Sequence, residues 1–246
     1  MPSTVVNLHT INLEIPSEAL VNCRRILSDK EKARANRFAR TSLGNRWLVA
    51  RASLRDVLAS YCAASPDELD FGKEQFGKPV LAGRHADLDL HFNLSHSNSI
   101  AVVAVTRAAP VGVDLEYKRA LPDWESVARR FFSPSENLQL SCVADLERQD
   151  AFYTCWTRKE AVIKATGEGL SARLDSFDVS LAPDAPVKVL ADRGIDRESG
   201  DWSLLHFDIG DRYVGAIALH GSGTINVLQQ NHWTMQYASS VPVLSN

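Results

Sequence analysis

The sequence predicts an α+β protein. Short segments with the period-two alternation of strands are interspersed with longer segments in which apolar residues recur at helical spacing. The 246 residues, of which 45% are apolar, suffice for one large or two small hydrophobic cores.

The overall charge and the cysteine pattern exclude several classes of protein. A net charge of −3 gives no general attraction to nucleic acid or to an anionic membrane. The chain contains no CxxC spacing, no signal peptide and no apolar run of about 18 residues, which argues against a zinc site, a disulfide framework and a transmembrane helix. We therefore expect a cytoplasmic, monomeric protein whose four cysteines stay reduced.

The first elements of the chain follow from alternation and capping signals. Residues 5–13 alternate like a strand, and Ser28 with Glu31 forms a capping-box pattern that opens a helix ending near residue 38. Residues 45–62 place apolar side chains at helical spacing, and this second helix ends before the proline at position 66.

Strands are expected next. Leu90, Phe92 and Leu94 share one face of a strand. This strand is expected to end within residues 93–97, where a loop presents Ser95 and His96. Two further strands, at residues 100–106 and 111–116, are expected to pair as a hairpin around residues 108–110.

The second half repeats this mixture. Ser133, Pro134 and Glu136 have the N-cap, N1 and N3 residue types of a helix start, and residues 156–165 form the next helix, with Gly167 and Gly169 as terminators. Four segments resemble strands of one closing antiparallel sheet, expected at 177–181, 187–190, 202–208 and 213–219. The sequence after about residue 221 has no clear pattern.

Two short segments carry chemistry. Residues 112–116 read GVDLE, so Asp114 and Glu116 project from the same face of a strand. In the following helix Glu160 lies one turn below Lys164, with Lys159 about a quarter-turn away. If strand and helix meet, three carboxylates hold a hard divalent cation while both lysines receive phosphate oxygens. Alternatively, the strand pair is a solvated edge and Glu160 with Lys164 an ordinary surface pair.

Five motifs in order favour the chemical interpretation; they are FGKPVL (76–81), FNLSHS (92–97), GVDLE (112–116), RRFFSPSE (129–136) and WTRKEAVIKATGEGL (156–170). With them the chain resembles the 4′-phosphopantetheinyl transferase superfamily, in its longer form that activates surfactin synthetase and related carrier-protein enzymes. A weaker likeness extends to residues 28–38.

The resemblance implies two similar α+β subdomains related by a pseudo-twofold, with the active site in the cleft between them. The boundary falls near residue 110, so residues 1–109 bind coenzyme A and residues 110–246 carry the metal and catalytic residues. The implied reaction transfers the phosphopantetheine arm of coenzyme A to a serine of an apo acyl, peptidyl or aryl carrier protein and releases 3′,5′-ADP.

The resemblance also implies roles for individual residues. Mg²⁺ is bound by Asp114, Glu116 and Glu160; Lys164 assists the leaving group, and Glu160 doubles as the base. Coenzyme A contacts are expected from Arg34, Lys78, Ser95, His96, Lys159 and Lys164. Glu31 occupies a position where relatives of this type have a lysine, so the cradle for the 3′-phosphate is less basic there unless Lys30 or Lys32 substitutes. Arg46 is a further candidate phosphate contact, and Trp156 is expected to pack in the core.

Two other functions stay open on the sequence. One is a noncatalytic module that binds coenzyme A or a nucleotide through the same groups. The other is a magnesium-dependent hydrolase that cleaves a pyrophosphate with water.

Overall fold

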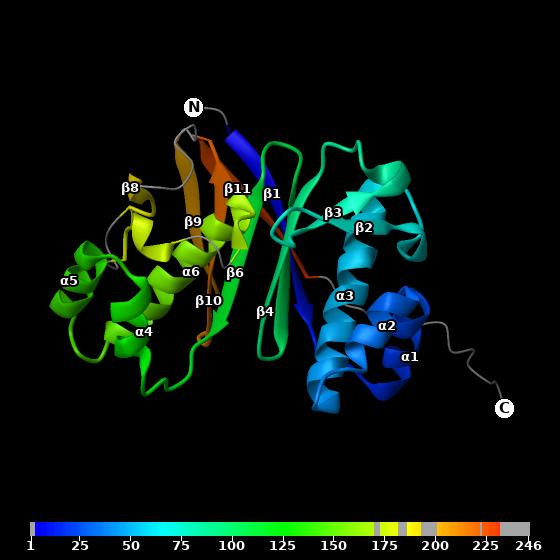
Figure 1. The fold of residues 1–246 in the computed structure, drawn as a ribbon, viewed down its shortest axis with the longest axis horizontal. Coiled ribbons are helices and arrows are strands. Elements are labelled where there is room, and N and C mark those ends of the chain that lie inside the picture. Colours follow the sequence, from blue (N-terminus) through cyan, green and yellow to red (C-terminus); the bar gives the residue numbers. More distant parts are fainter. Residues whose placement is uncertain (1–2, 170–172, 182–185, 193–200, 222, 232–246) are drawn as a thin grey trace.

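The fold places three helices on each side of a central set of strands. The computed structural model describes residues 3–169, 173–181, 186–192, 201–221 and 223–231. Helices α1–α3 lie on one side and α4–α6 on the other, with strands between them (Figure 1). The expected α+β class is confirmed.

The first half begins with a strand and three helices. The capping box at Ser28 is confirmed, because the Ser28 hydroxyl accepts from the Glu31 amide at 3.4 Å while the Glu31 carboxylate accepts from the Ser28 amide at 2.8 Å. Helix α1 was not predicted, and its N-cap, Pro16, makes no side-chain cap. The elements are β1 (Ser3–Asn12), α1 (Ser17–Arg25), α2 (Asp29–Ala35), α3 (Thr41–Cys62), β2 (Asp70–Lys73), β3 (Pro79–Ala82), β4 (His91–Ser97) and β5 (Ile100–Thr106), with 3-10 turns at Pro66–Glu68 and Gly83–His85.

The strands of this half differ from expectation in two ways. Ser95 and His96 lie within β4 rather than in a loop, and the hairpin joins β4 to β5 through a turn at Asn98, whose φ is 50°. The expected hairpin between residues 100–106 and 111–116 is wrong, since these strands lie in different sheets. Alternation identifies a strand, whereas the choice of partner depends on tertiary packing.

The second half confirms both predicted helix signals. Ser133 caps α5 in a second capping box, with Glu136 accepting from the Ser133 amide at 2.9 Å, and Gly167 ends α6 at a φ of 77°. The elements are β6 (Val111–Tyr117), α4 (Trp124–Phe131), α5 (Pro134–Cys142), α6 (Arg148–Thr166), a 3-10 turn at Leu174–Ser176, β7 (Phe177–Val179), β8 (Val189–Asp192), β9 (Trp202–Ile209), β10 (Tyr213–His220) and β11 (Thr224–Asn231).

The four strands predicted late in the chain exist but do not form one sheet. Strands β7 and β8 make a separate two-stranded sheet, whereas β9 and β10 join β6 in the order β6-β10-β9. The expectation of a single closing sheet is therefore corrected.

The end of the described chain returns to its beginning. Strand β11 pairs in parallel with β1 and completes a sheet in the order β11-β1-β5-β4. The sequence after residue 221 gave no pattern for this strand, which crosses the predicted division at residue 110. That division stays a prediction.

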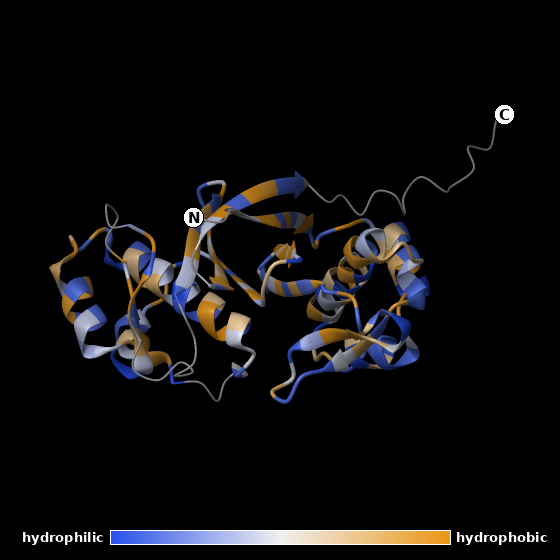
Figure 2. Ribbon diagram, turned by 90° about the horizontal axis from the view of Figure 1, so that it is seen from above, coloured by the Kyte–Doolittle hydropathy of each residue, from blue (hydrophilic) through white to orange (hydrophobic). Residues whose placement is uncertain are grey.

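A shared hydrophobic core joins the two sheets. Val6 and Leu8 of β1 pack in one cluster with Val113 and Leu115 of β6 and with Ile217 of β10. Apolar and polar residues alternate along several of these strands (Figure 2). Within the part of the chain that the structure describes, no helix combines the length and the apolarity that a membrane span requires. This shared core fixes the position of one sheet relative to the other.

Candidate active site between the two sheets

Strand β6 carries two acidic residues, and helix α6, which packs against this strand, carries Glu160. Asp114 and Glu116 lie on β6, and Gly112 lets α6 pack directly on that strand, because a Cβ at Gly112 would lie 2.0 Å from the Ala161 carbonyl oxygen. Burial, then the charge of Asp114, raises the pKa of Glu160. The same two causes raise the pKa of Glu116, to which the Glu160 charge also contributes. The three carboxylates therefore interact electrostatically.

Lys164 lies at the centre of this group. Its Nζ donates to Asp114 Oδ1 at 2.6 Å and to the Ser95 hydroxyl at 3.0 Å. The Asp114 side chain is only 5% exposed, whereas that of Lys164 is 28% exposed. The ammonium group thus connects the carboxylates to β4 and to solvent.

The two sheets meet at β4 in this site. The Ser95 hydroxyl donates to Asp114 Oδ1 at 3.0 Å, and the Ser97 hydroxyl donates to Glu116 Oε2 at 2.9 Å. His96 is on the opposite face of the strand and is exposed. Partial loss of hydration, followed by the Lys164 charge, lowers the pKa of His96.

The three carboxylates are ligands of the type that a hard cation prefers. Asp114 Oδ2 is buried and has no hydrogen-bond partner among the described residues, although a buried carboxylate oxygen normally has one. No three acidic, histidine or cysteine side chains are already gathered into a metal site in the described ranges. A divalent cation would bind the unpartnered Asp114 oxygen and would offset the repulsion between the carboxylates.

A large cavity lies in the first half of the chain. Its volume is about 950 Å³, and it extends from Arg34 on α2 to His96 on β4. Trp47 and Phe71 supply aromatic walls, and the Arg34 guanidinium lies 5.4 Å from the centre of the Trp47 ring. Basic side chains are prominent in the lining; they come from Lys30, Arg34, Arg51, Arg55 and Lys73.

Glu31 lies in the wall of this cavity, where its carboxylate is paired with two arginines. It forms ion pairs with Arg51 and with Arg55, the latter at 2.8 Å. Burial raises the pKa of Glu31, but the hydrogen bonds and charges of Arg51, the Ser28 amide and Arg55 outweigh it and hold that pKa below its usual range. The acidic residue at this position therefore brings two arginines with it. Sequence reasoning missed Arg51, although its spacing of four from Arg55 on α3 places both on one helix face.

Lys78 connects the two halves. Its Nζ donates to the carbonyl oxygens of Val111 at 3.1 Å and of Ala165 at 3.2 Å. Burial lowers the pKa of Lys78. The structure thus gives Lys78 two partners in the second half, at the start of β6 and at the end of α6, and its contact with coenzyme A stays a prediction.

Lys159 requires a correction. Its side chain is 0% exposed, and Nζ donates to Glu136 Oε1 and to the Phe177 carbonyl oxygen, each at 2.6 Å. Lys159 and Lys164 are five residues apart on α6, so they lie on different faces of the helix, and Lys159 points into the core of the second half. Lys159 is a buried structural residue in this conformation and does not face the cavities.

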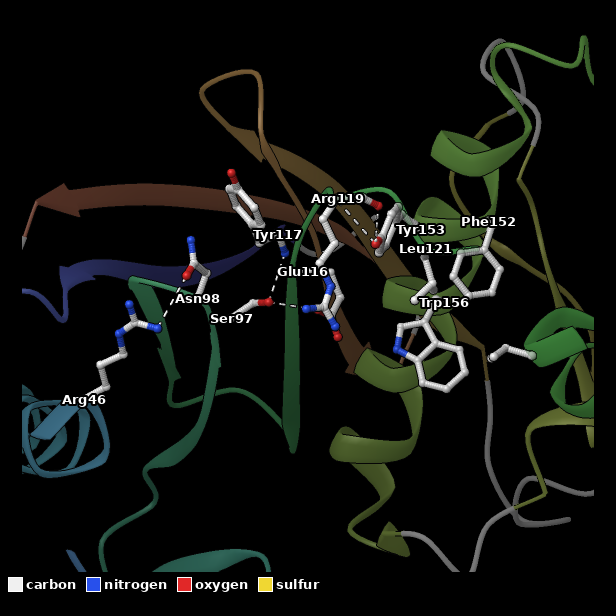
Figure 3. Close-up of a pocket in the computed structure, with 11 residues that line it drawn as sticks. Arg46, Ser97, Asn98, Glu116, Tyr117, Arg119, Leu121, Phe152, Tyr153 and Trp156 are labelled. Carbon is white, nitrogen blue, oxygen red and sulfur yellow. Dashed lines mark hydrogen bonds between the residues drawn. The ribbon is translucent and has the colours of Figure 1, made fainter. Parts of the chain in front are cut away.

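A second cavity of about 480 Å³ is lined in part by Glu116. Figure 3 shows Ser97 bonded to Glu116 at its centre and Arg46 bonded to Asn98 at one end. Arg46 also pairs with Glu14, so this candidate phosphate contact is already engaged. Trp156 packs against Phe152 and borders the cavity, in partial agreement with its expected core position.

Both parts of the chain match models of known protein families. Residues 16–108 match a family model described as 4′-phosphopantetheinyl transferase, N-terminal, and residues 110–218 match the 4′-phosphopantetheinyl transferase superfamily. The chain is 39% identical over 221 residues to the 4′-phosphopantetheinyl transferase HetI of Nostoc sp., covering 90% of each chain. It is 33% identical over 164 residues to the 4′-phosphopantetheinyl transferase Sfp of Bacillus subtilis, covering 66% of this chain and 70% of Sfp.

Proposed function

The chain belongs to the 4′-phosphopantetheinyl transferase superfamily, and from this we propose that it transfers the phosphopantetheine arm of coenzyme A to a serine of an apo carrier protein. The activity class, a 4′-phosphopantetheinyl transferase enzyme, follows from the family. The carrier, the metal and the residue roles are the proposal. One observation supports them most: His96 lines the basic cavity of the first half and lies within reach of the Lys164 charge, while Lys164 itself pairs with Asp114.

Coenzyme A is proposed to bind with its nucleotide in the 950 Å³ cavity. Arg34 lies in that cavity, where it is available to a 3′-phosphate, and His96 lies at the end nearest the carboxylates. The pyrophosphate then meets Lys164, whose ammonium group exchanges Asp114 for phosphate oxygens. The Ser95 hydroxyl, which accepts from Lys164, lies beside this ammonium group as a further hydrogen-bond donor or acceptor for the phosphate oxygens.

Asp114, Glu116 and Glu160 are proposed to hold Mg²⁺, which is generally used in this family. When bound, the ion neutralises charge on the pyrophosphate. Asp114 presents its unpartnered Oδ2 to this position, and Ser97 holds the carboxylate of Glu116. Glu160, whose pKa is raised by burial and by the Asp114 charge, is proposed to serve also as the base.

The transfer forms a bond between the serine oxygen and the phosphorus that carries the pantetheine, and it breaks the bond from that phosphorus to the bridging oxygen. Glu160 accepts the serine proton. Lys164 stabilises the negative charge that develops on the departing 3′,5′-ADP, where its interaction is stronger in the transition state than in the bound donor.

The carrier is proposed to dock beside the second cavity, on the segment that follows β6. Arg129 and Arg130 of α4 are exposed, whereas Trp124 and Phe131 are partly buried against the second core. Because the chain carries a net charge of −3, docking depends on apolar contact with local basic support. We expect only mild salt dependence of the carrier KM, and a clear loss of carrier affinity in Trp124→Ala combined with Arg129→Ala. The docking segment consists of Lys118, Arg119, Leu121, Trp124, Arg129, Arg130 and Phe131.

The test is a mass measurement on the carrier. The protein is incubated with coenzyme A, Mg²⁺ and an apo carrier protein, and we expect the carrier to gain one phosphopantetheine arm as 3′,5′-ADP appears. Release of 3′,5′-ADP without that gain would indicate a hydrolase, and neither product would indicate a binding module. Either result would contradict the proposal.

Single variants locate the reaction. Asp114→Ala and Glu160→Ala should each abolish most of the transfer, because each removes one negative charge from the cation site. Glu18→Ala, an exposed acidic residue on α1, is the matched control and should transfer normally. Near-normal turnover of Asp114→Ala at low Mg²⁺ would show that the site is elsewhere.

A further inference from the structure

The facing edges of the two sheets are joined by side chains rather than by paired backbones. Strand β4 is the edge of the first sheet and β6 the edge of the second. Three residues of β4, spaced by two, accept from backbone amides of β6 at a constant offset: Asn93 from Val113 at 2.9 Å, Ser95 from Leu115 at 3.3 Å and Ser97 from Tyr117 at 3.0 Å. The constant offset means that the two strands run in the same direction.

Two rungs of this ladder continue to the carboxylates. A hydroxyl accepts and donates at once, so Ser97 accepts from the Tyr117 amide while donating to Glu116 Oε2 at 2.9 Å. Ser95 does the same toward Asp114, but Lys164 shares its hydroxyl oxygen. Asn93 ends its rung at Val113 and contacts neither carboxylate through a described bond.

The Glu116 side chain has space to move and is repelled by its neighbouring carboxylates. Its side chain borders the 480 Å³ cavity of Figure 3, which gives the carboxylate room to turn. Asp114 and Glu160 both repel it. Fixing a glutamate side chain costs rotamer entropy, and the hydrogen bond from Ser97 to the charged carboxylate offsets that cost.

We propose that Ser97 is a positioning residue for the transfer: through its ladder hydrogen bond to β6 it holds the Glu116 carboxylate facing Asp114 and Glu160, in place for the metal. This inference rests on the proposed function, since it assigns a support to one of the proposed ligands. Partners that orient metal ligands typically change metal affinity by 10- to 100-fold when removed.

The experiment compares three variants of β4. Ser97→Ala removes the acceptor for Tyr117 and the donor for Glu116, Ser97→Thr keeps both, and Asn93→Ala removes a ladder bond alone. Binding of Mn²⁺ in the presence of coenzyme A is measured by electron paramagnetic resonance, and Mg²⁺ half-saturation is measured in the transfer assay. Unfolding in urea reports the stability of each variant.

We expect Ser97→Ala to weaken Mn²⁺ binding and to raise the Mg²⁺ half-saturation by about tenfold or more, while transfer at saturating Mg²⁺ largely recovers. Ser97→Thr should restore both values. Asn93→Ala should lose stability with unchanged metal dependence. In a Glu116→Ala background, Ser97→Ala should have no further effect on Mn²⁺ binding.

Three results would overturn the proposal: metal dependence of Ser97→Ala equal to wild type, an equal metal defect in Asn93→Ala, or a Ser97 effect that persists without Glu116. Absence of Mn²⁺ binding by the wild-type protein would overturn it as well. Because Mn²⁺ binding is read without a carrier, failure of the transfer reaction itself would be seen separately.

Discussion

Lys164 serves two negatively charged groups in turn under the proposed mechanism. In the structure it neutralises Asp114 and contacts Ser95. Both a divalent cation at Asp114 and a pyrophosphate nearby favour transfer of the ammonium group to phosphate oxygens. A single residue thus balances the site before and after the substrates bind.

Lys164→Ala should lower kcat by roughly 10²- to 10⁴-fold, the range for a group that assists proton transfer or leaving-group charge. The KM for coenzyme A should rise much less, because the interaction strengthens as that charge develops. Single-turnover kinetics separate the two effects. A variant with a normal chemical step and weakened coenzyme A binding would leave Lys164 as a positioning residue only.

Arg34 is tested by altering the ligand. If it contacts the 3′-phosphate, Arg34→Ala should raise the KM for coenzyme A by about 10- to 100-fold, as expected for a charge-assisted hydrogen bond. The penalty should nearly vanish with dephospho-coenzyme A, which lacks that phosphate. Arg24→Ala is the control, since Arg24 contacts Asn36 on the neighbouring helix and does not line the cavity. An equal penalty for both donors would indicate that Arg34 acts through the helix.

At the level of elements, α2 is fixed to α3 by one carboxylate. Glu31 closes the capping box of α2 and pairs with Arg51 and Arg55 on α3. Its side chain is 11% exposed. Without Glu31, the like charges of Arg51 and Arg55 would share this wall with no counter-ion between them, so the acid stabilises the cavity even as it reduces the charge available to a phosphate.

Glu31→Gln should therefore lower the free energy of unfolding by about 3 kcal/mol near neutral pH. The folded-state pKa of Glu31 lies below its ordinary value, so this contribution is present above the unfolded pKa and is lost as pH falls through the folded pKa. The difference between wild type and variant should stay constant above about pH 5 and shrink below about pH 4.3. Urea unfolding as a function of pH measures it.

Asp29→Asn provides the comparison for that experiment. Asp29 pairs with Lys32 in the same helix, but its side chain is 100% exposed. Its replacement should change stability little at any pH. A Glu31→Gln variant that behaved in the same way would show that the ion pairs on α3 do not stabilise the fold.

For the whole molecule, the relation between the halves depends on contacts that bridge them. The shared core, the ladder between β4 and β6 and the strand pair β1–β11 all cross from one half to the other. Lys78 adds a fourth connection through the Val111 and Ala165 carbonyl oxygens.

Lys78→Met should destabilise the protein without added coenzyme A by about 1–3 kcal/mol, because it leaves two partly buried carbonyl oxygens without a charged donor. Urea unfolding is the measurement. Lys73→Met, on the same hairpin but exposed, should unfold like wild type. Unchanged stability with a raised KM for coenzyme A would instead assign Lys78 to the ligand alone.

The local signals in the sequence were sufficient for most elements. Both capping boxes, the glycine that ends α6 and the two carboxylates on one strand depend on residues within a few positions of each other. The capping and turn geometries involved are short-range, so they are readable without knowledge of the fold.

Tertiary structure decided which strands pair and which charged groups meet. The segments at 100–106 and 111–116 are strands as expected, but they pair with other strands and not with each other, and β11 pairs with β1 from the far end of the chain. Lys159 and Lys164 look alike in sequence, yet the rotation of α6 buries one with Glu136 and opens the other to Asp114. Pairing and burial depend on packing between distant segments, and alternation along one strand or one helix specifies a face without naming what covers it.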